Sequence, residues 1–201
     1  MRVVSPAVVG SGVIVSKKGN RYLVLTNAHN LLGTDEAQVQ TSDGLAHLAL
    51  RIPRQSWGKK DVALLEFQSD RLYQVAQWSP QLATKGLAIV SAGFDFERQA
   101  VTISNGEVSQ LLEKPLRNGY QLGYSSRLNQ GMSGGPILDR TGLLLGINAM
   151  AAYPILNRAY VFADGSRPSP PTIKQLRRSN WGIPLQDVNG CLKLDYSPTL
   201  D

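Results

Sequence analysis

A serine set among glycines has surroundings suited to chemistry. The run Gly131-Met132-Ser133-Gly134-Gly135-Pro136 places Ser133 two residues after a glycine. Glycine adopts unusual backbone torsions and carries no Cβ, so the N–H groups of Gly131 and Ser133 can together face a substrate carbonyl as an oxyanion hole. A tight turn ahead of a strand has a similar composition. The hexapeptide alone therefore leaves two interpretations open, an acyl-transfer nucleophile and a glycine-rich turn.

Two upstream residues favour the nucleophile. His29 ends the apolar run 21–29, and Asp61 opens the apolar run 62–67. A serine hydroxyl needs a base at neutral pH, and imidazole is the only side chain whose ordinary pKa lies near 7. A carboxylate on the other ring nitrogen fixes the tautomer and stabilises the imidazolium. The chain order His, Asp, Ser is that of the chymotrypsin-type triad, and we predict that Ser133 is the nucleophile, His29 the base and Asp61 the residue that orients it. A core histidine and a strand-initiating aspartate would explain two of these residues separately, but not the three together.

The elements that must position these residues are predicted to be strands. Short β-branched and apolar runs alternate with Asn-Gly and Asp-Gly pairs, which are strong hairpin signals. Residues 100–104 and 107–111 are predicted to form one such hairpin. The stretch 70–85 has the composition of a connector, so we predict an N-terminal barrel over residues 1–78 and a C-terminal barrel over 79–201. The first would carry His29 and Asp61 and the second Ser133, with the site in the cleft between them.

Four segments resemble the trypsin-like serine peptidases, and most closely the bacterial branch that includes the high-temperature-requirement proteases. They are Gly10–Val15, Thr26–His29, Asp61–Leu65 and Gly131–Pro136. Gly146-Ile147-Asn148 and Trp181–Pro184 resemble later strands of that branch, so the likeness spans about residues 8–188. The resemblance implies an all-β fold of two antiparallel six-stranded β-barrels. It also implies a serine endopeptidase that acts on protein or peptide substrates through an acyl-enzyme on Ser133 and needs no cofactor.

The resemblance also implies a substrate pocket. Gly131, Met132 and Ser133 would form the oxyanion hole, and Ser126, Arg127 and Leu128 would lie near the base of the primary pocket. Gly146, Ile147 and Asn148 would form its wall and the edge that pairs with the substrate backbone. Arg127 replaces the aspartate of the trypsins, which disfavours cleavage after Lys or Arg. An inward Arg127 would select acidic side chains, whereas an outward one would leave a pocket for small or medium apolar side chains, which we favour.

Met132 is a further departure from the digestive relatives, which carry an aspartate before the nucleophile. That carboxylate pairs with an amino terminus freed by cleavage, and a thioether cannot form such a pair. We therefore expect packing, or a partner acting on neighbouring loops, to order the oxyanion hole. The Pro-rich loop 153–180, with a short helix predicted over 172–178, would either overhang the cleft or form a packed surface excursion.

Composition excludes several other classes. The 201 residues carry a formal charge of +6, but the basic residues are scattered in doublets, which indicates a solvated surface rather than a nucleic-acid footprint. The single cysteine, Cys191, excludes an internal disulfide, and His47 is the only histidine besides His29, so no Cys/His spacing predicts a metal site. No apolar run is long enough for a membrane helix, and the absence of a signal-peptide pattern favours a cytoplasmic location.

Two alternatives stand beside the free enzyme. One is a non-catalytic module of the same fold whose cleft holds a peptide without cutting it. The other is the protease effector domain of a larger regulated protein, with additional domains or a regulatory partner. The complete triad and Gly131 favour catalysis, because a binding module has no need of all four residues.

Overall fold

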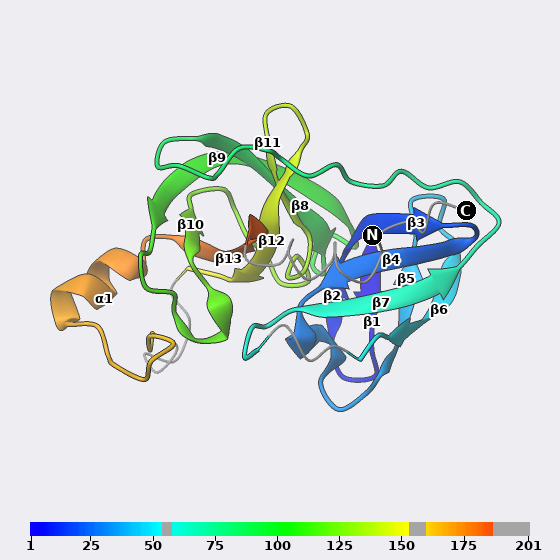
Figure 1. Ribbon diagram of the computed structural model, residues 1–201, viewed down its shortest axis with the longest axis horizontal. Coiled ribbons are helices and arrows are strands. Elements are labelled where there is room, and N and C mark those ends of the chain that lie inside the picture. The colour runs from blue at the N-terminus through cyan, green and yellow to red at the C-terminus, as the bar shows by residue number, and fades with distance from the viewer. Residues whose placement is uncertain (54–57, 153–159, 187–201) are drawn as a thin grey trace, which may run out of the picture.

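The computed structural model describes residues 1–53, 58–152 and 160–186, which fold into two β-structures side by side (Figure 1). The strands of the first are β1 (Arg2–Val4), β2 (Val9–Ser11), β3 (Val13–Lys18), β4 (Arg21–Thr26), β5 (Glu36–Gln40), β6 (Ala46–Arg51) and β7 (Ala63–Gln68). Those of the second are β8 (Ala88–Asp95), β9 (Ala100–Leu111), β10 (Leu122–Tyr124), β11 (Pro136–Asp139), β12 (Leu144–Met150) and β13 (Asn180–Pro184). The all-β prediction is therefore confirmed.

The first half is a curled antiparallel sheet in the order β2-β1-β5-β6-β7-β4-β3. Its strands follow from the sequence pattern, because β5 alternates buried and exposed side chains, whereas the central β4 and β7 are buried along most of their length. We expected six strands here, and the sheet has seven. The difference arises at the start of the chain, where β1 and β2 pair as a hairpin and β1 joins the sheet through β5.

The second half is a closed six-stranded barrel in the order β10-β13-β12-β11-β8-β9, as expected. The predicted hairpin at Asn105-Gly106 is wrong, because β9 runs unbroken from Ala100 to Leu111 and pairs with β8 from Ala100 to Glu107. Gly106 does not form a turn, and its lack of a side chain lets the Ser126 backbone approach β9 closely. A Cβ at this position would lie 2.3 Å from the Ser126 nitrogen. The chain reverses at residues 96–99, between β8 and β9.

Helix α1 (Pro170–Leu176) begins two residues before the predicted helix. The Ser169 side chain caps it by accepting a hydrogen bond from the Thr172 N–H, and the prolines Pro170 and Pro171 occupy its first turn. Leu176 is buried, and its carbonyl accepts a hydrogen bond from the Trp181 indole N–H at 3.1 Å. This part of the loop is therefore packed rather than overhanging the cleft, and α1 lies at the end of the molecule remote from the first half (Figure 1). No helix in the described ranges is both long and apolar enough to span a membrane.

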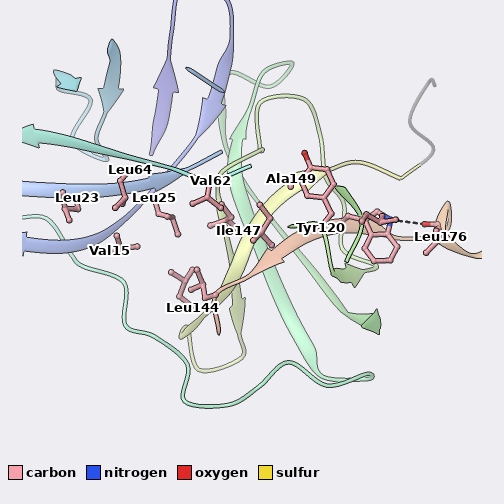
Figure 2. Packing of buried hydrophobic residues seen from close by; sticks show 14 of the residues in the cluster. Val15, Leu23, Leu25, Val62, Leu64, Tyr120, Leu144, Ile147, Ala149 and Leu176 are labelled. Atoms are coloured by element: carbon pink, nitrogen blue, oxygen red, sulfur yellow. Dashed lines mark hydrogen bonds between the residues drawn. The ribbon is translucent and has the colours of Figure 1, made fainter. Parts of the chain in front are cut away.

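One hydrophobic cluster runs across the boundary between the halves (Figure 2). Leu25 and Val62 of the first half pack in it with Ile147 and Ala149 of β12 and with Tyr120, which precedes β10. Val62 follows the predicted catalytic Asp61, and Ala149 lies near Ser133. The shared core therefore fixes the two halves against each other directly beneath the predicted site.

Candidate active site

His29 and Asp61 form a close pair at the end of the first sheet. His29 lies in the 3₁₀ turn Ala28–Leu31 after β4, and its Nδ1 is 2.6 Å from Asp61 Oδ2. Its backbone N–H donates to Asp61 Oδ1 at 2.8 Å, and the Asn27 side-chain amide donates to the Asp61 carbonyl at 2.9 Å. Because the carboxylate occupies Nδ1, the other ring nitrogen, Nε2, is left as the acceptor that a base needs.

The environment of Asp61 favours the ionised carboxylate. Its side chain is 6% exposed, and burial alone raises the pKa of an aspartate. The hydrogen bond and the charge of His29, together with hydrogen bonds from the Tyr120 hydroxyl and the His29 N–H, outweigh burial and hold the Asp61 pKa below its usual value. The carboxylate can therefore stabilise an imidazolium at neutral pH.

The loop before Ser133 presents two unused N–H groups. Gly131 has φ = +91°, a conformation open mainly to glycine, and a Cβ here would lie 2.6 Å from the Phe94 carbonyl oxygen. Within the described ranges, neither the Gly131 nor the Ser133 N–H donates a hydrogen bond. The Met132 N–H donates to the Asn129 carbonyl at 3.2 Å, so it is not free for an oxyanion. Of the three residues predicted for the hole, Gly131 and Ser133 retain available donors.

Packing and polar contacts order this loop. Met132 is fully buried against Gly93, where a Cβ would lie 2.7 Å from the Met132 Cα. The Asn129 side-chain amide donates to Asp95 Oδ2 at 2.6 Å, which ties the loop to the end of β8. The Phe96 N–H donates to the Gln130 carbonyl at 2.9 Å. These contacts engage the loop without an ion pair at position 132.

Contacts from the first half also reach the nucleophile loop. The Ser11 hydroxyl donates to the Gly131 carbonyl at 2.7 Å, and the Ser11 N–H donates to the Ser133 carbonyl at 2.7 Å. The Asn30 amide donates to the same Ser133 carbonyl at 3.0 Å. Sequence reasoning did not single out Ser11 or Asn30, although Ser11 lies in a segment that carries the family resemblance and Asn30 directly follows another.

The Ser133 hydroxyl points to a backbone carbonyl in this conformation. Its Oγ donates to the Ala149 carbonyl at 3.1 Å, and no hydrogen bond joins it to His29 among the residues described. The two side chains nevertheless border one cavity of about 480 Å³, together with Gly131 and the β1–β2 turn. Serine side chains interconvert between staggered rotamers, and catalytic hydrogen bonds often form only when substrate binds.

The residues predicted at the base of the primary pocket lie outside this cavity. Ser126 is buried and donates through its hydroxyl to Ser91 Oγ at 2.9 Å. Arg127 is exposed, and its backbone N–H donates to Ser104 Oγ at 2.8 Å. Leu128 is half-buried. The exposed guanidinium is consistent with an outward orientation of Arg127.

The predicted substrate-pairing edge lies within β12. Gly146, Ile147 and Asn148 are buried, and their backbones bond on both sides, to β13 and to the segment 135–137. The Asn148 side chain is also engaged, since it accepts from the Tyr124 hydroxyl at 2.8 Å and donates to the Ala92 carbonyl at 3.0 Å. The backbones of these three residues are thus already paired within the barrel, and their role as pocket wall and substrate-pairing edge stays a prediction. The pairing of β12 with β11 ends at Ile147, Asn148 bonds to the backbone of Gly134 and Gly135, and the Ala149 carbonyl contacts Ser133.

Tyr120 is another residue of the site that sequence reasoning missed. Its hydroxyl donates to Asp61 Oδ2 at 2.7 Å, from the turn after Arg117–Gly119. The Asn118-Gly119 pair marked this turn, but no local signal shows that the following tyrosine reaches Asp61. Cys191 lies outside the described residues.

Comparison with known proteins agrees with this geometry. The family model for the trypsin-like peptidase domain matches residues 10–147, and the chain belongs to that family. Serine protease HTRA1 of Xenopus laevis is 31% identical over 156 residues, which cover 72% of this chain and 32% of that protein. Serine protease Do-like HtrA of Bacillus subtilis is 29% identical over 152 residues, covering 70% of this chain and 33% of that protein. The matched part thus spans about a third of the length of these relatives.

Two solved structures share the fold. The inactive form of the Rv3671c protease superposes with a TM-score of 0.70 at 18% identity, covering 98% of this chain and 88% of that chain. The serine endoprotease from Yersinia pestis superposes with a TM-score of 0.69 at 22% identity, covering 96% of this chain and 61% of that chain. The likeness extends over both halves of the molecule.

Proposed function

We propose that this chain is a serine endopeptidase domain that hydrolyses peptide bonds through an acyl-enzyme on Ser133. The observation that carries the proposal is the 2.6 Å pair of His29 Nδ1 and Asp61 Oδ2 beside a cavity that Ser133 and Gly131 also line. Base, nucleophile and oxyanion donors thereby face one space, as acyl transfer requires. Family membership supports the same reaction class.

The first half of the reaction begins with rotation of the Ser133 hydroxyl from the Ala149 carbonyl toward His29 Nε2. His29 takes the hydroxyl proton while Ser133 Oγ forms a bond to the substrate carbonyl carbon. The Gly131 and Ser133 N–H groups stabilise the negative oxygen, and Asp61 stabilises the imidazolium. When the tetrahedral intermediate collapses, the peptide C–N bond breaks and His29 gives its proton to the leaving amine.

Hydrolysis of the acyl-enzyme uses the same groups. His29 takes a proton from water, and the water oxygen attacks the ester carbon. The bond between the acyl carbon and Ser133 Oγ then breaks as His29 returns the proton to Oγ, which releases the carboxylic acid product. The substrates would be proteins or peptides, since the relatives named above are serine proteases.

We also propose that the two halves meet near residue 78, with 1–78 contributing His29 and Asp61 and 79–201 contributing Ser133. A change of hydrogen-bond partners along the connector supports this division. The Ala76 N–H donates to the Ile14 carbonyl of the first half, whereas the Gln77 carbonyl and the Ser79 N–H both bond to Leu144 of the second.

A fluorophosphonate probe tests the proposed function directly. Wild type should be labelled and should hydrolyse an unfolded protein substrate, and Ser133→Ala should lose both activities. The free energy of unfolding of Ser133→Ala should differ from that of wild type by less than about 0.5 kcal/mol, because a hydroxyl at a cleft contributes little to packing. Ser42→Ala, at an exposed serine of the β5–β6 turn, is the matched control and should be labelled like wild type.

Two outcomes would count against the enzyme. Labelling that persists in Ser133→Ala would show that another residue is the nucleophile. A folded wild type that binds peptides but is neither labelled nor active would favour the non-catalytic binding module.

A further inference from the structure

Asp61 Oδ2 accepts two hydrogen bonds, one from each half of the molecule. His29 Nδ1 lies 2.6 Å away on the first half, and the Tyr120 hydroxyl lies 2.7 Å away on the second. Tyr120 is 9% exposed, and Asp61 is 7% exposed. The second donor is therefore held in a site largely closed to water, where a hydrogen bond to a charged group has a large effect.

We propose that Tyr120 is a positioning residue that acts through Asp61 and sets the pH at which His29 becomes a base. This inference rests on the proposed function of His29 and Asp61. The hydroxyl shares the negative charge on Oδ2 with His29, so it limits how strongly the carboxylate stabilises the imidazolium. It also holds the carboxylate in the plane that the imidazole needs.

The turn that carries Tyr120 contacts Asp61 twice. The Asp61 N–H donates to the Asn118 carbonyl at 2.9 Å, in addition to the side-chain hydrogen bond from Tyr120. Asn118 and Gly119 both have positive φ, at 65° and 79°, so the turn is tightly specified. The Tyr120 ring packs in the cluster shared by the two halves, near Ala149 and Ile147 (Figure 2). Backbone and ring together fix where the hydroxyl points.

The hydroxyl can act only as a donor toward this carboxylate. Burial and then the neighbouring Asp61 charge raise the pKa of Tyr120 well above its ordinary value, so the phenol stays protonated wherever a peptidase of this class works. The other charged groups nearby are Lys60, whose side chain packs over Gly119, and the exposed Arg117 of the same turn. The pKa of Asp61 responds chiefly, after burial, to His29 and Tyr120.

Tyr120→Phe removes the hydroxyl and keeps the ring in the core. The carboxylate would then stabilise the imidazolium more strongly, and His29 would lose its proton at higher pH. We expect the midpoint of the acid limb of kcat/KM to rise by about half a pH unit or more, since a hydrogen bond to a charge is worth more than one pKa unit of free energy. The loss of activity should therefore be larger at pH 6 than at pH 9.

Tyr124→Phe is the matched control. Tyr124 is also a buried tyrosine of the second half, and its hydroxyl donates to Asn148 Oδ1 at 2.8 Å, away from the pair. Losing this hydroxyl should destabilise the fold without moving the pH midpoint. Equal shifts in the two variants, or none in a folded, active Tyr120→Phe, would overturn the proposal.

A second measurement does not depend on catalysis. The chain has two histidines, so NMR of the imidazole signals follows His29 directly, with His47 as the internal reference. The His29 titration midpoint should rise in Tyr120→Phe while that of His47 stays fixed. If Tyr120→Phe does not fold, a fluorinated tyrosine at position 120 keeps the ring and donates more strongly, and it should lower the midpoint. A wild type inactive toward the fluorophosphonate would refute the proposed function, whereas an unmoved His29 midpoint would refute only the role of Tyr120.

Discussion

At the scale of single residues, the Asp61 carboxylate has the most consequential set of partners. Oδ1 accepts the His29 N–H, while Oδ2 accepts His29 Nδ1 and the Tyr120 hydroxyl. Every donor is neutral or can become positive, so no contact opposes the ionised form. A neutral isostere at position 61 would lose the negative charge, and it would no longer hold His29 in the tautomer that leaves Nε2 unprotonated.

Arg127 carries a prediction about specificity. Its side chain is exposed, and it borders no part of the cavity that His29 and Ser133 line. We therefore expect Arg127→Ala to cleave the same positions of a peptide library as wild type, with a preference for small or medium apolar side chains. Cleavage profiles read by mass spectrometry check this.

The control for Arg127 is Arg140→Ala, which removes an exposed arginine from the turn after β11. Both variants lose one positive charge, so any general effect of net charge on substrate encounter appears in both. A wild-type preference for acidic side chains that disappears only in Arg127→Ala would show that the guanidinium enters the pocket.

At the scale of elements, the conformation of the nucleophile loop depends on Gly131. Alanine there would carry the cost of positive φ, about 1–2 kcal/mol, and its Cβ would in addition clash with the Phe94 carbonyl oxygen. Relief of the clash must move the Gly131 N–H. We expect Gly131→Ala to lower kcat/KM by about 10²-fold or more, the effect of losing one oxyanion donor.

Gly142→Ala is the control that separates backbone strain from displacement of the Gly131 N–H. Gly142 has φ = +85° in the β11–β12 turn, with nothing within 4 Å of an added Cβ. The free energy of unfolding of Gly142→Ala, measured in urea, should fall by about the same 1–2 kcal/mol that positive φ costs an alanine. Its peptidase activity should stay at the wild-type level. Equal activity losses in both glycine variants would mean that strain, and not the oxyanion hole, explains Gly131.

The turns show what local sequence can and cannot predict. Asn118-Gly119 forms the expected turn, with positive φ at both residues. Asn105-Gly106 has the same letters but lies inside β9, because both residues pair with β8 and Gly106 leaves room for the Ser126 backbone. The tertiary environment decides whether an Asn-Gly pair forms a turn or lies in a strand, and the two residues alone do not reveal that environment.

The same limit applies to the site. His29, Asp61 and Ser133 could be proposed because each stands in a short motif with its own chemistry. Tyr120 and Ser11 could not, because they reach their partners across 59 and 120 residues of sequence. For residues 146–148 the resemblance indicates a strand, but it does not show where the pairing of that strand with β11 ends.

At the scale of the whole molecule, Ser11 joins the two halves. Its hydroxyl donates to the Gly131 carbonyl and accepts from the Phe94 N–H, each at 2.7 Å, and the residue is fully buried. Ser11→Ala leaves both backbone groups without this partner, which we expect to cost about 1–3 kcal/mol of unfolding free energy. Urea unfolding measures the loss.

Ser42→Ala again serves as the control, and its free energy of unfolding should stay within about 0.5 kcal/mol of wild type. Ser11→Ala should also react more slowly with the fluorophosphonate, because the Gly131 carbonyl loses its anchor. A stable Ser11→Ala with normal labelling would show that the other contacts between the halves suffice.

Because the Arg117–Tyr120 turn of the second half bonds to Asp61 of the first, the site is assembled only after both halves have been synthesised. During synthesis the N-terminal part of a chain emerges first, so His29 and Asp61 leave the ribosome well before Tyr120 and Ser133. Under the proposed mechanism, a nascent chain with only its first half folded has a base without its nucleophile and a carboxylate without its second donor. Proteolytic competence would then require the second half to fold, so a half-made chain could not cleave its neighbours.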